Sequence, residues 1–191
     1  MEKIQKGQKG YIDSQKKIKL LLCIAGLVII LADFFTGLAI TGTRKNLFTV
    51  VAILLALPEG KFLATYLVFF KHKSTPDDFI KKVEARNLKY SVVYDCVFST
   101  REKVVPVYAA VLGPDFVLCY TNAANVDRKK FETSLEEFVK AGKVKVKVSL
   151  MTEEKGFFNR LDQLSANDGK ISDYDKETID MVKTSVLAMC M

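Results

Sequence analysis

Three ionisable residues interrupt long apolar stretches, where charged side chains are rare. Asp33 lies within the apolar run 20–40, and Glu59 and Lys61 lie near the centre of the run 47–70. Charged groups inside a membrane span by default mark an ion path, an assembly contact or a headgroup site. These three residues are therefore the first candidates for a functional site.

A structural interpretation of the same residues carries more weight. Pro58 and Gly60 can kink the second run and admit water or headgroups to the charges. Alternatively, Asp33 and Lys61 form an ion pair, because side chains on antiparallel helices lean toward opposite ends of the bilayer, here toward each other. We expect the kink or the pair before a conducting role.

The remaining chemistry-bearing residues exclude most catalytic and metal sites. The four cysteines, at positions 23, 96, 119 and 190, contain no CxxC pair, and His72 is the only histidine. These spacings exclude the usual zinc sites and the Ser-His or Cys-His nucleophiles. No phosphate-binding glycine loop, HExxH or GxSxG motif is present. We expect reduced, buried thiols, no metal and no cofactor.

Both apolar runs are long enough to span a bilayer. The run 20–40 contains thirteen Leu, Ile, Val and Phe residues, which favour insertion by about 6 kcal/mol against at most about 3 kcal/mol for Asp33. A cleaved signal peptide is the rival interpretation, but the run is long and lacks a clear cleavage site. The run 47–70 is marginal alone and is expected to insert as a hairpin with the first.

The charge distribution predicts the orientation. Residues 1–70 carry nine Lys or Arg against four acids, and the remainder carries twenty against eighteen. Six lysines precede the first span and two follow the second, which places both termini in the cytosol by the positive-inside rule. The balanced remainder argues against a nucleic-acid partner. We expect membrane lipid, and either a membrane-protein partner or a second copy, as partners.

The layout resembles a group of uncharacterised bacterial two-span membrane proteins. The resemblance consists of a short basic lead, a first span, an LPxxK-type element in the second span (Leu57 to Lys61) and a small α/β domain. It implies the inner (plasma) membrane and no particular activity. The expected domains are a basic cytosolic segment 1–19, a transmembrane hairpin 20–70 with spans 20–40 and 47–70, and a cytosolic α/β domain 71–191.

The soluble part predicts a mixed sheet covered by helices. Ser74, Thr75 and Pro76 before two acids predict a helix start with a hydroxyl cap. The apolar composition of 89–98 predicts a central strand, and Gly113-Pro114 a hairpin turn. The expected elements are a helix from about 75 to 88, strands 89–98, 103–112 and 115–121, a helix 126–141, a strand 143–150, and helices 155–164 and 173–189.

This order, αβββαβαα, resembles the core of restriction-endonuclease-like nucleases. Such enzymes hold Mg²⁺ with an Asp and a Glu-x-Lys or Asp-x-Lys on the second and third strands. Here the second strand has no acid and the third lacks the lysine, so only Asp95, Glu102 and Asp115 remain as scattered carboxylates. The resemblance implies at most the fold. For Asp95 we expect a satisfied structural carboxylate rather than a catalytic group.

Lys143, Lys145 and Lys147 alternate with valines and form a basic stripe on the last predicted strand. An exposed face or edge protected by lysines is favoured over contact with anionic headgroups or an acidic partner. The sequence as a whole favours a membrane-tethered, non-enzymatic binding or regulatory module. The alternatives are a divergent nuclease-like enzyme and a small transport or channel accessory subunit.

Overall fold

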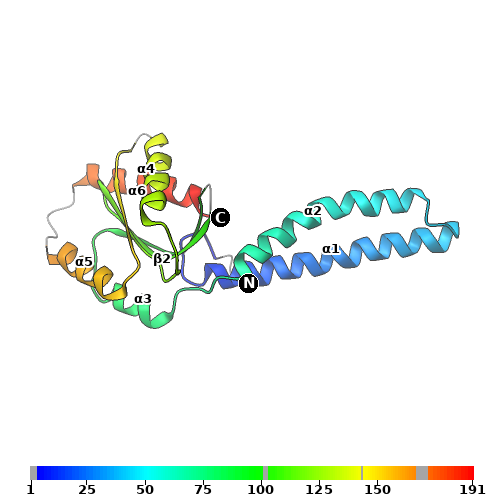
Figure 1. The fold of residues 1–191 in the computed structure, drawn as a ribbon, viewed down its shortest axis with the longest axis horizontal. Helices are drawn as coiled ribbons and strands as arrows, with labels where there is room; N and C mark the ends of the chain where they lie inside the picture. Colours follow the sequence, from blue (N-terminus) through cyan, green and yellow to red (C-terminus); the bar gives the residue numbers. More distant parts are fainter. Residues whose placement is uncertain (1–3, 101–102, 143, 167–171) are drawn as a thin grey trace. The chain divides into compact units, whose positions relative to one another are not determined.

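A computed structural model describes residues 4–100, 103–142, 144–166 and 172–191 (Figure 1). The chain divides into two compact units. One unit is Ile12–Lys73, and the other combines the residues up to Tyr11 with those from Ser74 onward. The second unit is therefore assembled from chain on both sides of the first.

The first unit is a hairpin of two long helices. Helix α1 spans Tyr11–Thr41 and α2 spans Leu47–Phe70, about 46 and 36 Å at 1.5 Å per residue. Both are long and apolar enough to cross a membrane. The α2 helix begins at Asn46, whose side chain caps the Thr49 N–H at 2.8 Å. It continues through Pro58, which removes a helical hydrogen bond, and Figure 1 shows that α2 is bent rather than straight.

The second unit is a four-stranded mixed sheet between two helical layers, which confirms the predicted order of elements. The strands lie in chain order, with the first two pairings antiparallel and the third parallel. The strands are β1 (Ser91–Ser99), β2 (Val104–Leu112), β3 (Phe116–Tyr120) and β4 (Lys147–Met151). The helices are α3 (Asp77–Glu84), α4 (Arg128–Ala141), α5 (Glu154–Ala166) and α6 (Asp173–Met189).

Each face of the sheet has its own apolar core. Helices α4 and α6 cover one face, where residues such as Leu135 and Val186 pack against the strands. Helices α3 and α5 cover the other, where Phe79 stacks on Tyr120 and Phe157 at centroid distances of 5.0 and 5.9 Å. The helical spacing of these apolar residues in the sequence therefore correctly predicts helices that cover the sheet, but not which face each helix covers.

Two predictions about this unit are wrong. Strand β1 is an edge strand rather than a central one. It is buried because chain termini, rather than another strand, cover its outer edge. In addition, α3 begins at Pro76 without a side-chain cap, because the Thr75 hydroxyl is bonded elsewhere.

Candidate functional site

Glu59 lies against α1 inside the helical hairpin. A Cβ at position 26 would collide with the Glu59 carboxylate in its present position, so the Glu59 side chain occupies space that the glycine leaves open on α1. The Cys23 thiol, one turn earlier on α1, hydrogen-bonds to the same carboxylate. Lys19 lies over the Phe62 ring at 5.5 Å. Glu59 is thus held at the helix interface by α1 groups.

A second close approach fixes the register of the hairpin. A Cβ on Gly37 would collide with the Phe48 side chain. Together with the contact of Gly26 and Glu59, this places Asp33 opposite Ala52, a buried small residue. The Oδ2 atom of Asp33 is buried there and has no hydrogen-bond partner.

The expected pair of Asp33 and Lys61 is not formed. In this register Lys61 lies nine residues along α2 from Ala52, about 13 Å from the level of Asp33. No ion pair joins Lys61 to an acid within the described parts of the chain. Its side chain is exposed, and it follows Glu59 by about 200° around α2, so it points away from α1.

The α/β unit contains an unusual buried carboxylate in β1. Asp95 is 1% exposed and has a φ of +52°, a left-handed conformation rare in strands. Its Oδ1 accepts hydrogen bonds from the Thr75 backbone N–H and from the Thr75 hydroxyl, both at 2.7 Å. Its Oδ2 is buried without a partner. The hydrogen bonds that we expected for a structural carboxylate are therefore present at Oδ1 but not at Oδ2.

The left-handed residue reverses which side chains of β1 face each core. Val93 lies in the core beneath α4 and α6, and so does Cys96, although three positions separate them. Strict alternation would put them on opposite faces. The reversal directs Asp95 toward Thr75, which precedes α3. The ladder with β2 is interrupted at Asp95 and Tyr108 and resumes beyond them in the same register.

Both segments that connect this unit to the hairpin end on β1. Thr75, which follows α2, is bonded to Asp95 as described. Gly7, which precedes α1, accepts a hydrogen bond from the N–H of Tyr94, the adjacent residue, at 2.8 Å. Gly7 has a φ of +82° and lies close to Val93 and Leu187. Two connections that are far apart in the sequence thus meet at neighbouring residues of one strand.

The C-terminal residues complete the cover of β1. The backbone of Cys190 forms an antiparallel β-bridge with Phe98, and the Met191 N–H donates to the Val97 carbonyl at 2.9 Å. The Lys6 ammonium donates to the Cys190 carbonyl at 2.7 Å. The basic N-terminal lead, expected only to set membrane orientation, therefore contributes to the fold.

All four cysteines are free. The Cys96 thiol forms a hydrogen bond with Cys190, which together with burial raises the pKa of Cys96 well above its usual value. Burial likewise raises the pKa of Cys119. Raised values keep these thiols protonated and unreactive.

The scattered carboxylates do not form a shared site among the described residues. Asp95 lies beside Thr75, whereas Asp115 lines a surface groove of about 520 Å³ against α6, with Lys145 and Thr178. Glu102 lies outside the described residues. No cluster of three His, Cys, Asp or Glu side chains suited to a metal is found within those residues.

The basic stripe lies at the β4 edge of the sheet. Lys145 and Lys147 are exposed, and Lys143 lies outside the described residues. The outward N–H groups of this edge are bonded by α4, since Glu136 accepts from Val148 at 2.9 Å and Glu132 from Leu150 at 2.7 Å. The edge is thus blocked by glutamates as well as flanked by lysines.

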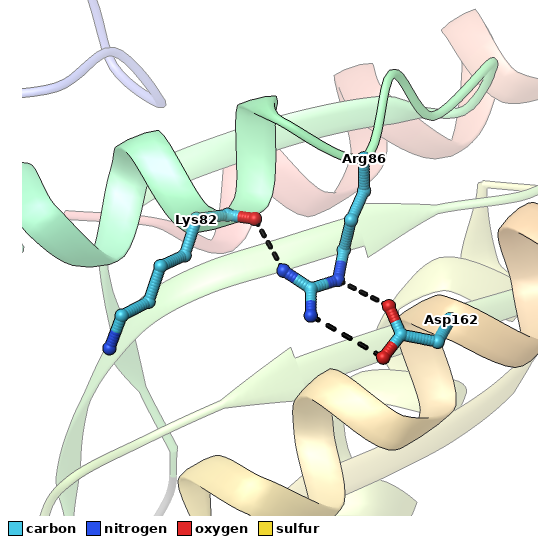
Figure 2. Close-up of polar contacts among 3 residues, drawn as sticks. All are labelled: Lys82, Arg86 and Asp162. Carbon is cyan, nitrogen blue, oxygen red and sulfur yellow. Dashed lines mark hydrogen bonds and ion pairs between the residues drawn. The ribbon is translucent and has the colours of Figure 1, made fainter.

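A surface contact that the sequence did not predict joins Arg86, just after the end of α3, to α5 (Figure 2). The Arg86 guanidinium donates to both Asp162 oxygens, at 2.6 and 3.4 Å, and also to the Lys82 carbonyl. Its carbon lies 4.5 Å from the Phe158 ring centroid. Arg86 and Asp162 are 76 positions apart in the sequence, so no local pattern could reveal the pair.

Comparison of the chain with protein families, with curated proteins and with solved structures found no match.

Proposed function

We propose that the chain is a membrane-anchored, non-enzymatic binding or regulatory module. The α/β unit lies at the cytosolic face of the inner membrane, and α1 and α2 cross that membrane as a hairpin. The partner of the chain is a membrane protein that presents a carboxylate to Lys61.

The exposed apolar surface of the hairpin supports the anchor. Twenty large apolar side chains between Leu20 and Phe70 are exposed in the isolated chain. A soluble protein rarely leaves so large a contiguous apolar surface in water. The hydrocarbon core of a bilayer would cover this surface, so no further segment of the chain is needed to cover it.

The N-terminal lead supports placing both termini on one side. The hydrogen bonds from the Tyr94 N–H to the Gly7 carbonyl and from Lys6 to the Cys190 carbonyl form only where the lead and the α/β unit share a compartment. An even number of spans meets this requirement. The excess of lysines at these ends selects the cytosol.

Lys61 is the observation that carries the binding role. Its Cα lies about 13 Å from the end of α2 at Phe70, on a surface that faces lipid if α2 is inserted. A lysine at that depth costs about 2.5–3.5 kcal/mol unless it is paired. Because no described acid of this chain pairs with it, a carboxylate on a neighbouring span offsets the cost.

The anchor and its orientation are tested first on the full chain in native membranes. The protein should stay in the pellet through alkaline extraction and enter solution only with detergent. Protease added outside intact cells should leave the α/β unit whole. Release without detergent would exclude the anchor, and cleavage from outside would exclude the orientation.

The binding role is tested by photo-crosslinking within the membrane. A photoreactive residue replaces Leu57, one turn before Lys61 and exposed on the same side of α2, while a matched probe replaces the exposed Ile29 of α1. The Leu57 probe should capture a membrane protein with an acidic residue in a span. Lys61→Leu should abolish this adduct and Lys61→Arg should retain it. An adduct indifferent to Lys61→Leu, or the same adduct from both probes, refutes the proposal.

A further inference from the structure

The open end of the hairpin, where α1 begins and α2 ends, carries a dense group of cations. The first turns of α1 and the residues that follow α2 come together there, because the helices run antiparallel. We define this group as the basic collar. It consists of Lys16, Lys17, Lys19, Lys71, His72 and Lys73.

Two observations show that Lys16 on α1 lies close to His72 and Lys71, which follow α2. The His72 imidazole lies near both Lys16 and Lys71. Burial lowers the pKa of His72 most, and the two lysine charges lower it further. The register of the hairpin also places Lys16 opposite Phe69, within one turn of Lys71. The collar therefore joins both helices, although 52 residues separate Lys19 from Lys71.

The charge of the collar is largely uncompensated. Asp13 pairs with Lys16 at 3.0 Å, and it is the only acid in the described residues 12–19 and 71–73. Lys17, Lys71 and Lys73 are exposed. Four lysines without an ion pair thus remain at one end of a two-helix unit.

Apolar side chains adjoin the collar directly. Leu20 and Phe70 are 42% and 63% exposed, on the hairpin side of the lysines. A ligand that satisfies both features has an anionic head and an apolar body. Free phosphate would satisfy only the lysines.

We propose that the basic collar binds the phosphate of an anionic phospholipid whose acyl chains lie against Leu20 and Phe70. This inference rests on the proposed membrane insertion and adds a lipid class to it. Each lysine near an anionic surface contributes a roughly fivefold preference for anionic lipid. Removing two exposed lysines should therefore lower that preference about 25-fold.

The chain contains no tryptophan, so Phe70→Trp creates a single fluorescent probe at the site. The full-length protein with this probe is placed in phosphatidylcholine vesicles that contain increasing brominated phosphatidylglycerol. Quenching should show a strong preference for the anionic lipid. Lys71→Gln with Lys73→Gln should reduce it about 25-fold, whereas Lys81→Gln with Lys140→Gln, exposed lysines of α3 and α4, should leave it unchanged.

Three outcomes overturn the proposal. Equal quenching by brominated phosphatidylcholine shows that the site does not select charge. An equal loss in the Lys81 and Lys140 control shows that only net charge matters. Competition by millimolar inorganic phosphate shows a site for free anions. Failure of insertion itself is distinguishable, because the protein would then not sediment with vesicles of either composition.

Discussion

Substitution of Asp95 by alanine should loosen β1 and its attachment to the segment that follows α2. Asp95 Oδ1 accepts two hydrogen bonds from Thr75 at 2.7 Å, and the acceptor is 1% exposed. A hydrogen bond to a charged acceptor contributes about 1.5–3 kcal/mol, and removal of the acceptor leaves a buried N–H unsatisfied. Alanine also tolerates the left-handed conformation less well than aspartate. We expect a loss of about 3–5 kcal/mol.

The adjacent Cys96 provides the assay, because its thiol is buried and reacts only when the strand opens. Alkylation of the full chain followed by mass spectrometry should show Cys96 reacting at least 100-fold faster in Asp95→Ala. Asp95→Asn keeps a hydrogen-bond acceptor, so the alkylation rate of Cys96 should increase much less in this variant than in Asp95→Ala. Thr75→Val removes only the hydroxyl and should produce a smaller increase, about tenfold.

The double variant separates this bond from general destabilisation. Combining Asp95→Ala with Thr75→Val should give less than the sum of the two single effects, since after Asp95→Ala the Thr75 hydroxyl keeps only the Tyr108 carbonyl, at 2.8 Å, as an acceptor. Strictly additive effects, or an Asp95→Ala rate within fivefold of the original, would show that Oδ1 does not hold Thr75. The reasoning about the β1 junction would then be wrong.

Three further predictions concern the edges of the same sheet. Glu132→Ala should lose about 1.5–3 kcal/mol and speed hydrogen exchange of its β4 partner, whereas Glu137→Ala, an exposed change on the same helix, should have little effect. Gly7→Val should loosen the N-terminal lead more than Gly10→Val, by protease sensitivity, because both have positive φ but only Gly7 is crowded. Burial, with Glu84, raises the pKa of Tyr94 to about 12, so its contribution to stability should persist to pH 10 and disappear as pH rises through 12. The absorbance of phenolate should show this late step and lose it in Tyr94→Phe.

The elements of the α/β unit could be predicted because each depends on local periodicity. Leu135 and Val139 recur at helical spacing, and Val148 and Leu150 alternate as a strand requires. The position of β1 in the sheet could not be predicted in this way. An apolar strand looks the same whether a neighbouring strand or a chain terminus covers its edge, and Gly7 lies 84 residues from the strand it covers.

The hairpin charges show why residue type alone did not predict the site. Leaning side chains suggested a bond between Asp33 and Lys61, but glycine contacts set the register and keep these two residues apart. Gly26 signals this in the sequence only when its partner is known to be Glu59. Similarly, Glu132 and Glu136 have the spacing of one helix face, but their role depends on β4 lying beside that face.

The junction on β1 bears on the choice between a passive anchor and a regulatory module. A passive anchor needs one covalent connection to its domain. Here the segments on both sides of the hairpin are hydrogen-bonded to adjacent residues, Tyr94 and Asp95, and the second of these is held in a rare backbone conformation. Any change at the ends of α1 and α2 that separates the two segments must break one of these bonds or distort β1. Because β1 contributes side chains to both apolar cores, such a distortion would reach both layers of the domain, and the regulation proposed above would need a coupling of this kind.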